Sequence, residues 1–171
     1  YWAGKELAFP HVPREHAKFA RTQVAGNLVI VSGCQALDHD SVKTETDDIA
    51  EQSELVLEKI RVGMEETGGD LSSVAKTNVF VKDADALQIY RNVERAYFEK
   101  HSPEAAARPP ASTAFIVAEL PRPEFLIEVE AFGVIDKDAP DFAYAHQTGT
   151  EIAAASVTAG HLVFLSGCDG A

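Results

Sequence analysis

Short apolar segments alternate with two long amphipathic ones along this chain. Val74–Val81 is rich in β-branched residues and alternates between apolar and polar positions, which predicts a strand. Further strands are predicted near Thr113–Val117 and over Phe125–Ile135. Apolar runs that follow Gly26 and Gly160 predict two more, each entered through a glycine turn.

Two amphipathic helices are predicted between these strands. The first has an acidic opening turn, in which Asp48 followed by Glu51 resembles a capping box, and Gly68-Gly69 ends it. Its apolar face is formed by Ile49, Val56, Leu57, Ile60 and Met64. The second runs from about Ala86 to Lys100 and is ended by Ser102-Pro103. Its apolar face is formed by Leu87, Tyr90, Val93, Tyr97 and Phe98.

An internal repeat sets the domain organisation. Phe19–Cys34 (FARTQVAGNLVIVSGC) and Ala153–Cys168 (AAASVTAGHLVFLSGC) are offset by 134 residues and agree at 8 of 16 positions. Each copy predicts a turn, an apolar strand of four residues and a glycine break at Gly33 or Gly167. We therefore expect one complete module over residues 1–136, followed over residues 137–171 by a linker and the first strands of a second.

The order of elements predicts the fold class. A hairpin is followed by helix, strand, helix, strand and strand. Two helices can cover only one face of such a sheet, so we expect an α+β sandwich in which a mixed sheet carries both helices on one face.

Composition excludes several classes of function. Acidic residues outnumber basic ones 27 to 15, and a net charge of −12 repels polyphosphate, so nucleic acid is not expected as a partner. The apolar runs are far shorter than the roughly 20 residues that span a bilayer, so no membrane partner is expected. Two cysteines are too few for a disulfide scaffold, which favours a cytoplasmic location.

Several segments in unbroken order resemble one family. They are Asn27–Gly33, Asp48–Gln52, Val74–Asp83, Ala96–Phe98, Pro110–Thr113 and Leu120–Ala131. Together they resemble the YjgF/YER057c/UK114 family, also called Rid and formerly L-PSP endoribonuclease, from Phe19 to Ile135.

The resemblance implies a chorismate-mutase-like α+β fold and trimers with ligand clefts between subunits. Two modules in one chain would form a trimer-like, pseudo-hexameric ring. Typical members hydrolyse enamines and imines to keto acids and ammonia without a cofactor. They hold the substrate carboxylate with an arginine and work through water with a glutamate on the last strand.

The arginine position departs from the family pattern. Where typical members have Pro-Ala-Arg, this chain has Pro110-Ala111-Ser112. Ser112 takes the position by the alignment from the following strand, and Arg108 takes it by the count from the preceding helix. On the second helix, Arg91 stands where an asparagine is usual, and Asn92 follows it. These four residues are the candidate substrate contacts of a divergent branch.

Glu128 matches the family glutamate. Glu128 and Glu130 point to the same face of their strand, and like charges so placed raise one another's pKa. Such a group suits proton exchange with water near neutral pH. The alternative is that both carboxylates lie on a solvated face. The resemblance favours function for Glu128 and not for Glu130.

Cys34 and Cys168 follow Ser-Gly in both copies of the repeat. They are candidate catalytic nucleophiles, which would need a neighbouring base, or buried inert thiols. The six histidines have no metal-ligand spacing, so no metal is expected.

These observations favour a hydrolase that acts on C–N bonds of a small nitrogen-containing metabolite, either an imine deaminase or an amidohydrolase. The alternative is a binding or regulatory module without catalysis. RNA cleavage is a third interpretation, which the net charge disfavours.

The second module is the remaining expectation. Its apolar strand Leu162–Leu165 would leave ladder hydrogen bonds unmade, so we expect a second chain to complete the module. Self-cleavage after Ala171, a nick or a shortened chain would each account for this. Self-cleavage would expose a new N-terminal nucleophile and favour amide hydrolysis.

Overall fold

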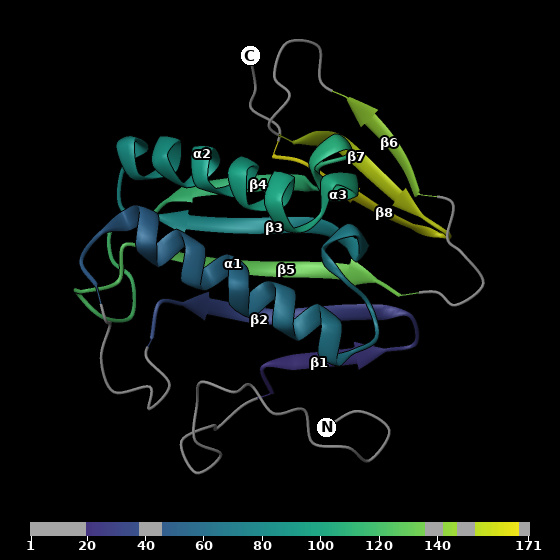
Figure 1. The fold of residues 1–171 in the computed structure, drawn as a ribbon, viewed down its shortest axis with the longest axis horizontal. Helices are drawn as coiled ribbons and strands as arrows, with labels where there is room; N and C mark the ends of the chain where they lie inside the picture. The colour runs from purple at the N-terminus through teal and green to yellow at the C-terminus, as the bar shows by residue number, and fades with distance from the viewer. Residues whose placement is uncertain (1–19, 38–45, 136–141, 147–152, 168–171) are drawn as a thin grey trace.

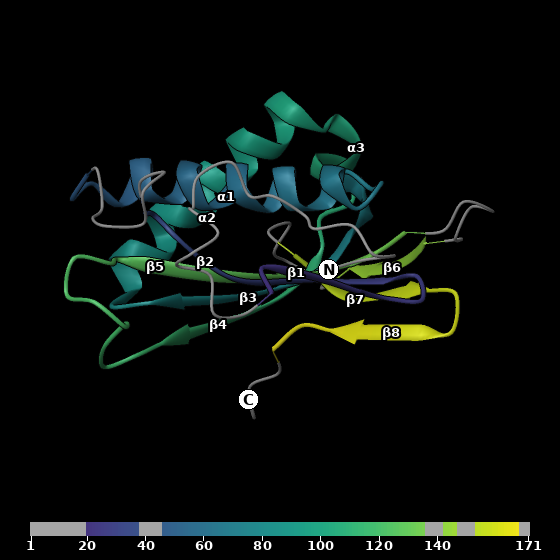
Figure 2. The same cartoon turned by 90° about the horizontal axis from the view of Figure 1, so that it is seen from below.

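Two long helices lie across one face of a mixed sheet and leave the opposite face open (Figures 1 and 2). This computed structural model describes residues 20–37, 46–135, 142–146 and 153–167. The sheet has the strand order β1-β2-β5-β3-β4-β7-β6, and β8 pairs with β7. The expected α+β fold with two helices on one face is confirmed.

The first copy of the repeat folds as a hairpin. β1 (Thr22–Ala25) and β2 (Leu28–Gln35) are antiparallel, and Gly26 makes the turn with φ of 64°. A positive φ is the conformation that glycine adopts without strain. The expected break at Gly33 is wrong, because β2 continues to Gln35. The pairing of β2 with β5 only shifts register between Val31 and Cys34.

α1 (Ile49–Glu66) begins and ends where the sequence predicts. The Asp48 carboxylate accepts hydrogen bonds from the N–H groups of Ala50 and Glu51, as an N-cap should. The expected capping box is only half formed, because the N–H of Asp48 donates to Thr46 Oγ1. A short 3₁₀ helix η2 (Leu71–Ser73) follows, capped by Asp70.

The remaining elements of the first module complete the sheet. β3 (Val74–Val81) has the predicted bounds, and α2 (Ala84–His101) is slightly longer than expected. A short helix α3 (Pro103–Ala107), which the sequence analysis missed, leads to β4 (Ala111–Ile116). β4 is parallel to β3, whereas β5 (Ile127–Val134) is antiparallel to it.

The core lies between this sheet and the helices. The largest of its fully buried side chains include Leu57, Ile60 and Met64 from α1 and Tyr90 from α2. Alternation along β5 buries Ile127, Val129 and Ala131 on the helix side. Glu128 therefore faces the open side of the sheet.

The second copy of the repeat also folds as a hairpin. β7 (Ala154–Ala159) pairs with β8 (Leu162–Leu165) on one side and with β6 (Phe142–His146) on the other. We expected the backbone hydrogen bonds of Leu162–Leu165 to lack a partner strand. This is wrong for the edge that faces β7, because β7 pairs with all four residues of β8. Val163 and Leu165 remain about 60% exposed.

In the described part of the chain, no helix is both long enough and apolar enough to cross a bilayer.

Candidate functional site

Glu128 is held against the hairpin of its own module. Its Oε2 accepts a hydrogen bond of 2.6 Å from Gln35 Nε2. The close approach of Glu128 to β2 requires a glycine at position 33, because a Cβ there would lie 1.9 Å from Glu128 Oε1. The Ser-Gly segment of the repeat thus forms the surface on which this carboxylate rests.

Two buried polar side chains fix the backbone around Glu128. Gln52 on α1 is fully buried, accepts from the N–H of Leu126 and donates to the carbonyl oxygen of Glu124, both at 2.9 Å. Lys59, about two turns further along α1, is 6% exposed and donates to the carbonyl oxygen of Gln35 at 2.7 Å. These contacts position β5 and the end of β2 relative to each other.

A second polar cluster lies at the β4 edge. Arg91 Nη2 donates to Ser112 Oγ at 2.8 Å, and Thr77 Oγ1 donates to the same oxygen at 2.9 Å. Arg91 Nη1 pairs with Glu94 at 2.7 Å, and Glu94 also accepts from Tyr90. Burial works to lower the pKa of Arg91, but the charges of Glu94 and Tyr90 and the hydrogen bond to Glu94 together outweigh it and leave the pKa raised, so the guanidinium is charged.

Glu128 and Ser112 lie on opposite sides of the sheet of their module. Ser112 and its partner Thr77 are buried on the helix side, where Arg91 reaches them from α2. Glu128 faces the open side. The structure therefore places the predicted acid and the predicted substrate contacts in two separate half-sites.

The second hairpin docks on the half-site that contains Ser112. The backbone N–H of Ser112 donates to Ser166 Oγ at 2.9 Å, and the N–H of Gly167 donates to the carbonyl oxygen of Ser112 at 3.1 Å. The N–H of Ala154 donates to the carbonyl oxygen of Pro110 at 3.2 Å. The second hairpin thereby extends the β4 edge of the sheet.

The two hairpins have equivalent internal hydrogen bonds at their ends. Ser32 Oγ donates to the carbonyl oxygen of Ala20, and Ser166 Oγ donates to that of Ala154, which is Ala20 plus the repeat offset. Each serine N–H also bonds the next carbonyl oxygen of its own first strand, at 2.8 and 2.9 Å. The two hairpins therefore match in these internal hydrogen bonds.

The junction also brings Lys76 and Thr113 to Gly167. Lys76 Nζ donates to Thr113 Oγ1 and to the carbonyl oxygen of Leu165. A Cβ on Gly167 would lie 3.1 Å from Thr113 Cγ2. Gly33 and Gly167 occupy equivalent positions in the two hairpins. Gly33 lies against Glu128, and Gly167 lies against Thr113.

Arg108 and Asn92 lie away from both half-sites. Arg108 caps the end of α3, where it pairs with Glu104 and its guanidinium carbon lies 5.7 Å from the Tyr144 ring centroid. Asn92 is exposed on α2, where its closest polar contact is Gln88 at 3.5 Å. Of the four predicted substrate contacts, the structure brings together Arg91 and Ser112.

Cys34 is buried on the helix side of β2. Burial raises the pKa of its thiol to about 12, and the nearby charge of Glu128 adds to this while Lys59 opposes it. A protonated, inaccessible thiol supports the inert alternative for Cys34. Cys168 lies outside the described residues. Within the described ranges, no three His, Cys, Asp or Glu side chains gather as metal ligands.

Three residues of these clusters were not predicted from the sequence as site residues: Gln35, Lys59 and Lys76. Gln35 has the same strand parity as Gly33, so alternation predicts that the two share a face of β2. The pairing of β2 with β5 is what places Gln35 beside Glu128. Lys59 lies between the apolar positions of α1, which is a signal for a buried lysine. Lys76 was visible only as part of a matching motif, because its partners come from β4 and β8.

The fold and the two half-sites define an α+β sandwich of the YjgF type, and comparisons with known proteins give the family. The family model described as Endoribonuclease L-PSP matches residues 10–135. The chain belongs to this family.

Curated relatives support the assignment over most of the chain. A RutC family protein of Pyrococcus abyssi is 30% identical over 128 residues, which is 74% of this chain and 94% of that protein. A 2-iminobutanoate/2-iminopropanoate deaminase of Salmonella typhimurium is 28% identical over 130 residues, 76% of this chain and 97% of the enzyme.

Solved structures show the same fold. The crystal structure of the YjgF gene product of E. coli superposes with a TM-score of 0.66 at 27% identity, over 77% of this chain and 99% of that one. E. coli TdcF with bound serine superposes with a TM-score of 0.67 at 22% identity, over 77% and 99% of the two chains. The second likeness shows the fold alone.

Proposed function

We propose that this chain is a hydrolase of small imines and enamines whose reaction site forms where the hairpin of one module meets the β4 edge of another. The docking of Ser166–Gly167 on Ser112 carries this proposal. The same Ser-Gly segment supports Glu128 in the first module, so the contact brings a Glu128-type carboxylate to a β4 edge. The relatives named as iminobutanoate deaminases support the reaction class.

The reaction needs one base and one anion-binding group. Glu128 takes a proton from water, and the hydroxide adds to the imine carbon. The nitrogen receives that proton, which gives a neutral carbinolamine. The proton of its new hydroxyl group then passes through Glu128 to the amino nitrogen, the C–N bond breaks to release ammonia, and the ketone C=O forms. Imine and water become ketone and ammonia, with atoms and charges balanced.

Arg91 supplies the positive charge at the β4 edge in this proposal. Its guanidinium has five N–H donors, and Glu94 and Ser112 account for two contacts. A substrate carboxylate at Ser112 would be held by a guanidinium from α2 in place of one from β4. The carboxylate-binding guanidinium would thus come from a different element than in typical family members, which have an arginine at the Ser112 position. This difference is expected to change which imino acids fit the site.

The test uses 2-iminobutanoate and 2-iminopropanoate generated in the cuvette by an amino-acid oxidase. The wild type should release keto acid and ammonia faster than spontaneous hydrolysis. Glu128→Gln should lower the catalysed rate by about 10²- to 10⁴-fold, the usual contribution of a general base. Glu130→Gln is the matched control on the same strand face and should retain activity. Wild-type activity in Glu128→Gln would refute the role of Glu128.

A binding module without catalysis is the second candidate. The pairing of Arg91 with Glu94 favours it, because this pairing already neutralises the guanidinium. In that case the two imines would raise the melting temperature without being hydrolysed, and Glu128→Gln would change neither result.

A further inference from the structure

Glu128 lies in a row of four side chains that crosses the open face of the sheet, over the neighbouring strands β2, β5, β3 and β4 (Figure 1). Its partner on β2 is Gln35, its partner on β3 is Phe80, and Phe80 is in turn paired with Phe115 on β4. Residues paired in this way point to the same face of a sheet. The row therefore runs from an amide, through the carboxylate, to two aromatic rings.

The two rings form an apolar surface beside Glu128. Their centroids are 5.2 Å apart and their planes differ by 13°, so the rings of Phe80 and Phe115 are stacked. Phe115 is 43% exposed, so one side of the stack meets solvent. Covering an exposed aromatic surface with another apolar group is favourable, because the apolar area is removed from water.

The other side chains next to Glu128 on this face are polar. On the β2 side, Gln35 Nε2 donates to Glu128 Oε2 at 2.6 Å. In the next row along the strands, Asn78 Nδ2 donates to Glu130 Oε2 at 3.3 Å. Among the described residues of these two rows, the aromatic stack is thus the apolar surface available to a group attached to the reacting carbon.

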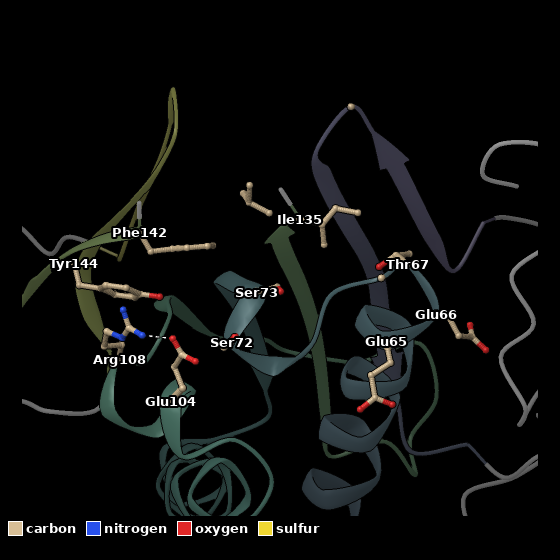
Figure 3. A pocket seen from close by; sticks show the side chains of 13 residues that line it. Glu65, Glu66, Thr67, Ser72, Ser73, Glu104, Arg108, Ile135, Phe142 and Tyr144 are labelled. Atoms are coloured by element: carbon tan, nitrogen blue, oxygen red, sulfur yellow. Dashed lines mark hydrogen bonds and ion pairs between the residues drawn. The ribbon is translucent and has the colours of Figure 1, made fainter. Parts of the chain in front are cut away.

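The cavity shown in Figure 3 lies too far away to receive that group. It measures about 760 Å³, and Ile135 and Phe142 are among its lining residues. Ile135 follows Glu128 by seven residues, which is roughly 23 Å along an extended strand. The cavity is therefore at the opposite end of the sheet from Glu128.

We propose that Phe80 and Phe115 make the site selective for imines with an aromatic side chain, which lies on the stacked rings while the imine carbon faces Glu128. Neighbouring strands are about 4.8 Å apart, a step that a benzyl group covers from the imine carbon and a methyl group does not. This inference rests on the hydrolysis proposed above and names its substrate class.

Hydrolysis of two imines by the full chain measures this selectivity. An amino-acid oxidase generates 2-imino-3-phenylpropanoate from phenylalanine and 2-iminopropanoate from alanine in the cuvette, and kcat/KM is determined for each. The value for the phenyl imine should be at least about tenfold higher, because burial of the apolar side chain in the transition state adds to it.

Phe115→Ala should remove most of the preference. Because Phe115 is partly exposed, its truncation leaves the core intact. The variant should lower kcat/KM for the phenyl imine about tenfold more than kcat/KM for 2-iminopropanoate. Ile89→Ala is the matched control, because Ile89 is 37% exposed on α2, and it should leave both values at those of the wild type.

Binding of unreactive acids separates this inference from the proposed hydrolysis. In isothermal titration, 3-phenylpropionate should bind the full chain about tenfold more tightly than propionate, and Phe115→Ala should remove the difference. Hydrolysis of neither imine would refute the hydrolase, and the binding difference would still decide the role of the aromatic stack. Equal kcat/KM for the two imines in an active wild type, an unchanged preference in Phe115→Ala, or equal binding of the two acids would each overturn the inference.

Discussion

At the scale of single residues, the contact between Gly33 and Glu128 is the most restrictive feature of the site. A methyl group at position 33 would overlap the Glu128 carboxylate, which is the flexible end of a side chain. Gly33→Ala should therefore fold with a small loss of stability but displace the carboxylate and lower imine hydrolysis by about 10²-fold.

A double-mutant comparison identifies the cause of that loss. If Gly33→Ala acts through Glu128, then Gly33→Ala combined with Glu128→Gln should be no slower than Glu128→Gln alone. A double mutant whose loss in steady-state rate is the product of the two single losses would instead show that Gly33 acts independently of Glu128.

The thiol of Cys34 gives a second prediction at this scale. With its pKa raised to about 12, Cys34 carries almost no thiolate at pH 8, and it is also buried. In a Cys168→Ala background, iodoacetamide should modify native Cys34 far more slowly than unfolded Cys34. Equal rates in the native and unfolded chains would restore Cys34 as a candidate nucleophile.

At the scale of elements, the sequence predicts most of the first module, because its helices and strands have strong local periodicity. The bounds of β3 and the start and end of α1 agree closely with the prediction. α3 was missed, since five residues are too few for a periodic signal. The continuation of β2 through Gly33 was also missed, because the partner that keeps it extended is the distant strand β5.

The candidate site was less predictable than the fold. The sequence indicated Glu128, Arg91 and Ser112 individually, but strand parity alone does not say that an arginine on α2 reaches β4. It also gave Arg108 as the alternative to Ser112 at the family arginine position, whereas Arg108 caps α3 and lies near Tyr144. Contacts between distant elements determined both outcomes.

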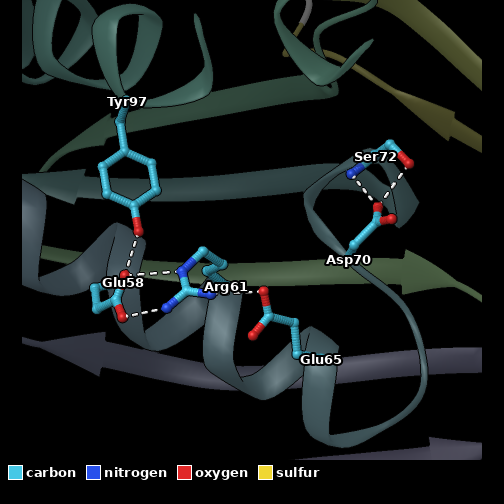
Figure 4. Close-up of polar contacts among 6 residues, drawn as sticks. All are labelled: Glu58, Arg61, Glu65, Asp70, Ser72 and Tyr97. Carbon is cyan, nitrogen blue, oxygen red and sulfur yellow. Dashed lines mark hydrogen bonds and ion pairs between the residues drawn. The ribbon is translucent and has the colours of Figure 1, made fainter. Parts of the chain in front are cut away.

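The polar clamp between α1 and α2 has a predictable pH dependence (Figure 4). Hydrogen bonds from Arg61 and Tyr97 lower the pKa of Glu58 to about 2. The ionised Glu58 carboxylate therefore stabilises the folded chain fully above the pKa of an unfolded glutamate, about 4.3. This contribution to the free energy of unfolding is lost as the pH falls toward 2. Because the side chain is 36% exposed, Glu58→Gln should cost about 1 kcal/mol at pH 7 and almost nothing near pH 2. Urea unfolding at both pH values measures this, and an equal cost at both would contradict it.

The docking of the second hairpin gives a further prediction for elements. Ser166→Ala removes the acceptor for the N–H of Ser112 and should destabilise the junction by about 1–3 kcal/mol. Hydrogen exchange at the Ser112 amide should accelerate accordingly. Ser32→Ala is the matched control, because it removes the equivalent internal bond in the first hairpin. Equal exchange at Ser112 in Ser166→Ala and Ser32→Ala would contradict the docking.

At the scale of the whole molecule, we propose that modules associate through repeated contacts between a Ser-Gly hairpin and a β4 edge. The Ser32 hairpin has the same internal hydrogen bonds as the docked one. Because the β4 edge of this chain already holds its own second hairpin, the Ser32 hairpin should dock on the free β4 edge of another module, such as the second module that another chain would complete. A ring of such contacts would pair each Glu128-type acid with a β4 edge.

Specific activity measured against protein concentration, with sedimentation on the same samples, tests this claim most directly. The account predicts that imine hydrolysis per chain falls on dilution in parallel with the loss of the assembly. Ser32→Ala should move both transitions together to higher concentration. A monomeric chain with full activity, or a Ser32→Ala variant that dissociates without losing activity, would contradict a site formed between modules.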